Sequence, residues 1–202
     1  IMPSARVRNR CRIAVLAVAT LSLCLSNTYA STGAVDLNRG LLGRWTFDEG
    51  KGAIAGDVSG RDNHGKIMGG AKWAKGKIGG ALEFDGSDDF VSIPNESAFD
   101  ITDGVTVSAW IRVESFTKPW QAFVTKGDRA WRLHRANETK GVGFACSDLS
   151  RQEVGDLLGE ADVADSQWHH VAGVLDGDQA LIFVDGVNDT SAASSPKISV
   201  ND

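Results

Sequence analysis

From residue 41 onward, hydrophobic and polar positions alternate in short segments that are separated by glycine-rich turns. The clearest segment is 105–113, where valine, alanine and isoleucine take the odd positions, while Thr106, Ser108, Trp110 and Arg112 take the even ones. Alternation with a period of two predicts a strand with one face in the core and one in solvent. Trp110 falls on the polar face, where it either packs under a loop or offers its ring on an open sheet.

Further segments repeat this rhythm, which is typical of an antiparallel β-sandwich. Residues 80–94 are predicted as a hairpin, because glycine at Gly86 can take the positive φ of a tight turn and Pro94 ends the returning strand. Residues 176–177 (Asp-Gly) predict the reversal between the last two strands. Besides 105–113, we predict strands at 42–47, 64–68, 81–84, 90–93, 122–126, 131–134, 142–145, 169–175 and 180–184.

The first 30 residues have the features of a secretory signal peptide. Four arginines and no acidic residue precede an apolar run at 13–25. The small residue at the end of Thr28-Tyr29-Ala30 predicts cleavage after Ala30. The run is shorter than the roughly 20 residues that span a bilayer. Acylation of Cys24 in a lipoprotein is the alternative. We therefore expect a protein that is secreted, periplasmic or on the cell surface, with no membrane span after cleavage.

The remaining chain predicts a linker at 31–40 and one domain at 41–202. Residues 198–200 begin another apolar segment, so we expect the domain to be incomplete at its C-terminal end. Without residues 1–30 the chain has 17 basic and 26 acidic residues, a net charge of −9. Such an acidic chain is a poor partner for nucleic acid. Cys11 and Cys24 leave with the signal, and Cys146 is predicted to be a small core residue.

Several short motifs follow one another along the chain and together resemble a known family. They are Trp-Thr-Phe-Asp-Glu-Gly at 45–50, Asp-Val-Ser-Gly at 57–60, Phe-Asp-Gly to Ile-Pro at 84–94, Val-Ser-Ala-Trp-Ile at 107–111, Trp-His-His-Val-Ala at 168–172 and Phe-Val-Asp-Gly at 183–186. In this order they resemble the laminin G-like branch of the concanavalin A-like lectin and glucanase jelly rolls, as found in bacterial secreted proteins. The resemblance implies an all-β fold, an antiparallel jelly roll of two sheets. Function follows less directly, since one sandwich hosts many tasks.

Catalytic residues are not predicted. Glycoside hydrolases of this architecture need paired carboxylates on one strand face. The nearest candidates, Glu160 and Asp162, lie in a polar, loop-like stretch. We therefore expect a non-catalytic binding module. An accessory or protein-adhesion domain of a larger secreted enzyme or surface protein is the alternative, and a glycoside hydrolase is less favoured.

Calcium is the cofactor that the loop acids suggest. Aspartates in glycine-rich loops offer the hard oxygen ligands that calcium prefers. The resemblance implies Asp57 and Asp85 as ligands of a structural ion, and Asp128 as a ligand of an ion at the rim of the sandwich. Turn formation is the competing explanation, because aspartate before glycine is itself a turn signal.

Aromatic residues suggest an extracellular glycan or glycoprotein as partner. The chain has six tryptophans, and flat aromatic faces beside polar groups suit sugar binding. Trp120, in a loop after Lys118-Pro119, and Trp131, which follows Gly127-Asp128-Arg129, are the candidates for exposed rings, and Trp110 is the candidate on a sheet face. A core position remains open for each of these rings.

Overall fold

The computed structural model describes residues 11–19, 36, 38–127, 130–146, 156–177 and 179–193. The predicted calcium ligand Asp128 lies outside these residues, as do most of the predicted linker and the expected continuation at 198–200.

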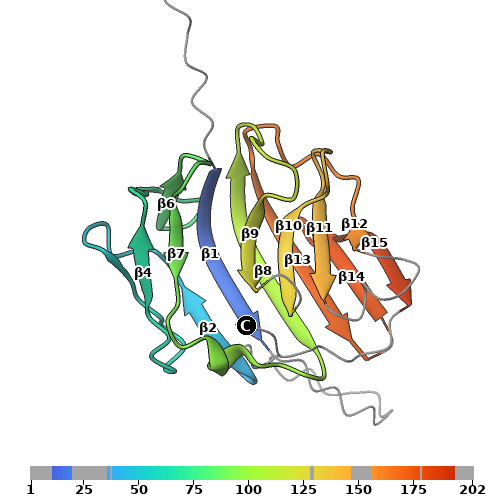
Figure 1. Ribbon diagram of the computed structural model, residues 1–202, viewed down its shortest axis with the longest axis horizontal. Coiled ribbons are helices and arrows are strands. Elements are labelled where there is room, and N and C mark those ends of the chain that lie inside the picture. The colour runs from blue at the N-terminus through green and yellow to red at the C-terminus, as the bar shows by residue number, and fades with distance from the viewer. Residues whose placement is uncertain are drawn as a thin grey trace, which may run out of the picture.

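The described residues form two layers of β-structure (Figure 1). One layer is an eight-stranded antiparallel sheet with the strand order β15-β14-β13-β8-β1-β6-β5, and β2 also pairs with β1. Its strands are β1 (Cys11–Ala19), β2 (Leu41–Trp45), β5 (Lys72–Lys75), β6 (Gly80–Phe84), β8 (Val105–Val113), β13 (Trp168–Asp176), β14 (Gln179–Val184) and β15 (Val187–Ala193).

The other layer consists of two smaller antiparallel sheets, with the orders β12-β11-β10-β9 and β3-β4-β7. Their strands are β3 (Ile54–Ala55), β4 (Gly65–Met68), β7 (Phe90–Ser92), β9 (Ala122–Lys126), β10 (Trp131–Arg135), β11 (Val142–Cys146) and β12 (Leu157–Leu158). A single 3-10 turn, η1 (Glu96–Phe99), is the described helical element. The prediction of an all-β, antiparallel sandwich is confirmed, and the predicted second sheet is divided into two small sheets.

The core lies between the layers. Along β8 buried and half-buried positions alternate from end to end, as the sequence predicts. The odd positions of β8 pack with residues of the small sheets such as Leu133 and Phe144, which are fully buried. Cys146 is also buried, so its predicted core position is confirmed.

The predicted hairpin at residues 80–94 is wrong. β6 lies within the large sheet between β1 and β5, so it has no open edge for β7, and β7 pairs with β4 in a small sheet. The turn at 85–89 therefore carries the chain from one layer to the other. The reversal at 176–177 is confirmed, because β13 pairs with β14 on both sides of it.

The apolar segment predicted as a signal peptide forms β1, in the middle of the large sheet (Figure 1). On one side its register places Cys11 opposite Val113 and Ala19 opposite Thr106. On the other side it pairs with β6 and with β2. Cleavage after Ala30 would thus remove a central strand. Cleavage itself stays a prediction.

Candidate ligand cleft

A cavity of about 720 Å³ opens between β7 and β9, which belong to different small sheets. In the described part of the chain β7 pairs with β4 and β9 with β10, so the two strands face each other across the cavity without pairing. The volume lies within the range of small-molecule sites. The inner wall is aromatic and is formed by Trp45, Phe47, Phe99, Phe123 and Trp131, all of which are buried.

Trp120 lies at the mouth of the cavity with 41% of its surface exposed. Its backbone has a φ of 58°, a strained value for a bulky side chain, and its N–H donates to the carbonyl of Asn137 at 3.3 Å. Phe90, on β7, is also exposed and lines the same cavity. The expectation of an exposed Trp120 ring is confirmed, and the ring borders a space that can hold a ligand.

An acidic turn borders the same cavity where the chain crosses between the layers. Asp85, Asp88 and Asp89 bring carboxylate oxygens within 4.8 Å of one another. Asp85 accepts a hydrogen bond from the N–H of Ser87 at 2.8 Å, and Asp89 accepts one from the N–H of Asp85 at 2.9 Å. The other carboxylate oxygens of this group are hard ligands of the kind that a divalent cation could bind.

The acidic turn and the Trp120 loop are tied together. The hydroxyl of Thr117 donates to the carbonyl of Gly86 at 3.1 Å, and the ammonium of Lys118 donates to the carbonyl of Ser87 at 3.0 Å. A ligand that holds the acidic turn in one conformation would therefore also restrain the loop that carries Trp120.

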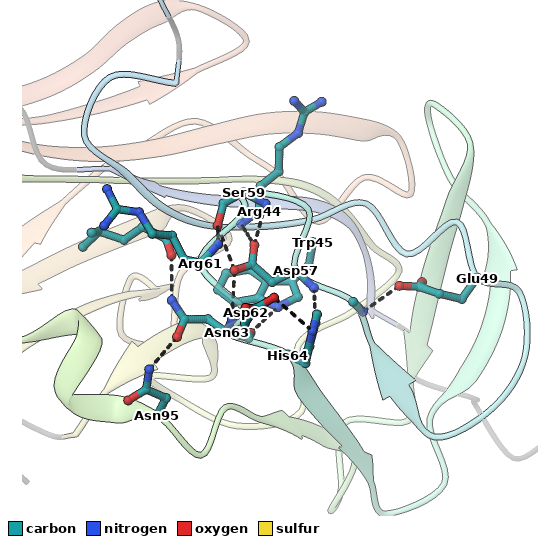
Figure 2. A network of polar contacts seen from close by, with 12 residues as sticks. Arg44, Trp45, Glu49, Asp57, Ser59, Arg61, Asp62, Asn63, His64 and Asn95 are labelled. Atoms are coloured by element: carbon teal, nitrogen blue, oxygen red, sulfur yellow. Dashed lines mark hydrogen bonds and ion pairs between the residues drawn. The ribbon is translucent and has the colours of Figure 1, made fainter.

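Asp57, the other predicted calcium ligand, is the centre of a separate network (Figure 2). One carboxylate oxygen accepts the N–H groups of Arg44 at 2.9 Å and Ser59 at 2.8 Å. The other accepts the hydroxyl of Ser59 at 2.8 Å and the N–H of Asn63 at 3.0 Å. Four protein donors thus surround the carboxylate, so Asp57 clamps the loop 57–63 to β2.

These contacts also set the protonation of Asp57. Burial alone would raise the pKa of this carboxyl, but the hydrogen bonds from Arg44, Ser59 and Asn63 outweigh it and lower the pKa. Among the described residues, the acidic turn is the group that brings three or more potential metal-binding side chains together, and Asp57 does not belong to it. The geometry therefore favours a clamp rather than a cation ligand at this position.

Trp131 belongs to the buried inner wall of the cavity, and Trp110 lies outside the cavity. Trp131 is only 4% exposed and packs edge-on against Phe99, so the expectation of an exposed ring is wrong: the strand β10 turns it into the core. Trp110 is half-buried on the outer face of the large sheet, with the ammonium of Lys77 5.7 Å from its ring and the ring of His170 at 5.3 Å. Of the three predicted rings, Trp120 is the one that borders the cavity mouth.

Sequence reasoning missed a polar cluster next to Trp120. The rings of Trp120 and His134 are 5.5 Å apart, and the guanidinium of Arg132 lies 6.0 Å from the Trp120 ring. Arg132 donates to Asp156 at 2.8 Å. The alternation of β10 could have placed Arg132 and His134 on one face, but no local motif joins them to Trp120 or to Asp156.

His134 is fully buried although it can ionise. Burial lowers its pKa, and the neighbouring Arg132 charge acts in the same direction, whereas the Arg135 carbonyl and Asp156 act against it. The lowered pKa favours a neutral ring. Its Nδ1 lies 2.7 Å from the carbonyl of Arg135, which can only accept, so the proton of the neutral ring is on Nδ1.

The acids considered for catalysis lie in a loop. Asp162 pairs with Lys140 at 2.9 Å, and the N–H of Glu160 donates to Asp189 at 3.0 Å. Neither Glu160 nor Asp162 lines the cavity.

Comparison with known proteins identifies the family. The sequence profile described as the concanavalin A-like lectin/glucanases superfamily, in its laminin G group, matches residues 85–202, more than half of the chain. The chain belongs to this superfamily. The match begins at the acidic turn and includes the Trp120 loop and the polar cluster.

A solved structure supports the same fold. The crystal structure of the binding domain of Paraclostridial Mosquitocidal Protein 1 is similar with a TM-score of 0.53 and 13% sequence identity. The similarity covers 74% of this chain and 41% of that chain, so this chain corresponds to less than half of the other protein's length.

No curated protein sequence matches. Within the described residues, no helix is long and apolar enough to cross a membrane.

Proposed function

We propose that the chain is a non-catalytic module that binds an extracellular glycan in the cleft between β7 and β9. The observation that carries the proposal is the exposed ring of Trp120 at the mouth of a 720 Å³ cavity. A pyranose presents an apolar face to such a ring and hydroxyl groups to its surroundings. Side chains at the rim, such as Gln121 and Glu96, offer hydrogen bonds to those hydroxyls.

We further propose that calcium orders this cleft through Asp85, Asp88 and Asp89. Calcium would neutralise three carboxylates that lie close together, and it would hold the turn in one conformation. Because Thr117 and Lys118 tie the turn to the Trp120 loop, the ion would also limit the motion of that ring. The signal-like residues 1–30 support an extracellular setting, where calcium is plentiful.

The test of the binding proposal is a glycan array followed by calorimetric titration of the best glycan. Trp120→Ala should weaken binding at least tenfold, since an exposed stacking ring contributes affinity and little core packing. Trp110→Ala is the matched control, because it removes the same side chain from the outer face of the large sheet. Loss of binding in Trp110→Ala alone would move the site to that sheet. An array with no binder, together with a captured protein partner that needs Trp120, would favour the adhesion alternative.

The test of the calcium proposal is the melting temperature with calcium and with a chelator. A cation that binds only the folded state raises the melting temperature by mass action. The shift should shrink in Asp88→Asn and persist in Asp57→Asn, which lies outside the acidic turn. Superimposed melting curves in the two buffers would contradict the proposal.

A further inference from the structure

We propose that Arg132 and His134, on the face of β10 next to Trp120, form a site for one hydroxyl group of a sugar. This inference rests on the proposed function and adds to it the polar groups that would recognise the glycan. It concerns a place adjacent to the cavity rather than the cavity itself, because neither Arg132 nor His134 lines that space.

The backbone places the two side chains together on one face of β10. Arg132 and His134 are two residues apart on β10, so they project from the same face of the strand. Opposite them on β11 are the smallest residues of that strand, Ala145 and Gly143 respectively. A Cβ atom at Gly143 would lie 2.4 Å from Cε1 of His134, so the His134 ring occupies the space that a larger residue would fill.

Two polar atoms in this place are buried without a partner: Nε of Arg132 and Nε2 of His134. Nε of arginine always carries a hydrogen and can only donate. Nε2 of His134 presents a lone pair, because the proton of the neutral ring is held on Nδ1 by the carbonyl of Arg135. Asp156 cannot satisfy Nε2, since its nearest oxygen is 3.8 Å away and is itself an acceptor.

One donor and one acceptor in the same small site match the chemistry of a hydroxyl group. A hydroxyl can accept from Nε–H of Arg132 and donate to Nε2 of His134 at the same time. An unsatisfied buried group of either kind is unfavourable, so a ligand that satisfies both is bound more tightly than one that lacks the hydroxyl. Asp156 holds the arginine through Nη2, which donates to its carboxylate at 2.8 Å.

Trp120 is suited to be the movable cover of this site. Its ring lies against His134 and Arg132, yet it is 41% exposed and is attached to a loop with a strained φ of 58°. A rotation of the ring away from His134 would open the two polar atoms to a hydroxyl. The same ring would then contact the apolar face of the sugar.

The test is a titration of the full chain with D-glucose, D-galactose, D-mannose and N-acetylglucosamine at millimolar concentration. NMR measures the ¹⁵N shift of Nε2 of His134, and tryptophan fluorescence detects a change around Trp120. The Trp120→Phe variant shows how much of the fluorescence change comes from Trp120. We expect at least one sugar to shift Nε2 of His134. His134→Phe, which keeps a ring but lacks Nε2, should weaken binding of that sugar about tenfold. His170→Phe, beside Trp110, is the matched control and should leave the affinity unchanged.

The possible outcomes separate this inference from the proposed function. Sugar binding that depends on Trp120 but leaves the Nε2 shift unchanged would overturn the inference and leave the proposed function standing. No response from any of the four sugars in either readout would overturn this inference, and the glycan array would decide the proposed function. If His134→Phe does not fold, the Nε2 shift of the unaltered chain decides. If every sugar and an osmotically matched salt change the Nε2 shift by the same amount, the change reflects a water molecule at His134 and no sugar hydroxyl. This result would also overturn the inference.

Discussion

The position of β1 yields a strong prediction about residues 1–30. In the structure this strand separates β8 from β6 and pairs with β2 as well. A chain that starts at Ser31 would lack β1, and β8 and β6 would then border an open position in the middle of the large sheet. The perturbation to make is therefore the removal of residues 1–30, either by signal peptidase or by design.

The expected loss can be estimated from the structure. Net hydrogen bonds contribute about 1 kcal/mol each, while ordering the strand costs about 1–2 kcal/mol per residue, so the nine-residue ladder is close to neutral. The loss comes from the neighbours, because the core positions of β8 and Leu82 on β6 are almost completely buried. Uncovering roughly 200 Å² of apolar surface costs about 5 kcal/mol. This is comparable with the whole stability of a typical domain.

The assay is refolding from urea of residues 1–202 and of residues 31–202, followed by size exclusion and an unfolding curve. The short chain should unfold at a lower urea concentration and should associate. A synthetic peptide of residues 10–20 should restore part of the loss. The same peptide with Ala17→Pro is the control, since Ala17 lies opposite Ser108 and Arg44 and proline removes its N–H. Equal midpoints for the two chains, with a monomeric short form, would refute the reasoning.

Three further predictions concern the clamp, the surface histidines and the core. Asp57→Ala should lower the free energy of unfolding by about 3 kcal/mol, because three backbone N–H groups lose their acceptor, whereas Asp57→Asn should lower it less; urea unfolding measures both. Burial alone would lower the pKa of His169, but its hydrogen bonds to Asp185 and Asp165 outweigh burial and raise the pKa. The charged form of His169 therefore stabilises the fold fully below about pH 6.5, and this stabilisation is lost as the pH rises through the raised pKa. Burial lowers the pKa of His170, so its effect has the opposite sign: it destabilises as pH falls below about 6.5. The difference in melting temperature between the unaltered chain and each of His169→Gln and His170→Gln, measured from pH 5 to 8, should change with pH in opposite directions for the two variants, and changes in the same direction would contradict the prediction. Gly173→Ala should destabilise by about 1–3 kcal/mol in the same urea assay, because the new Cβ would lie 2.3 Å from the Phe144 ring, and an unchanged midpoint would show that the core can adjust.

The strands could be predicted from the sequence to a large extent, because each reflects a local pattern. The predicted segments recur as strands whose ends differ by at most two residues, and β8 and β9 have the predicted bounds. Strands without apolar alternation were missed, as β5 (Lys-Trp-Ala-Lys) and the polar edge strand β15 show. β1 was missed for another reason. An apolar run with basic residues before it can be either a signal peptide or a core strand, and the sequence favours the signal peptide.

Strand pairing and the polar cluster required the three-dimensional structure. A turn signal shows where the chain reverses but not which edge is free, so the hairpin at 80–94 was wrong. The charged residues around Trp131 suggest an exposed ring at the start of its predicted strand, yet the register of β10 places Trp131 opposite Cys146 in the core. Arg132 shares the strand β10 with His134, but Trp120 and Asp156 come from two other segments, and only packing brings these two residues to His134.

The turn that made the hairpin prediction wrong also explains why a cleft exists. A hairpin would have kept β6 and β7 in one sheet, with the acids at its tip and far from any cavity. Because the turn instead crosses between the layers, β7 begins a separate small sheet, and its unpaired edge faces β9 across the cavity. The crossing also places Asp85 beside the Trp120 loop, where Thr117 and Lys118 bind the turn. The aromatic ring and the acids, which the sequence suggested separately, are thus neighbours as a consequence of the chain topology.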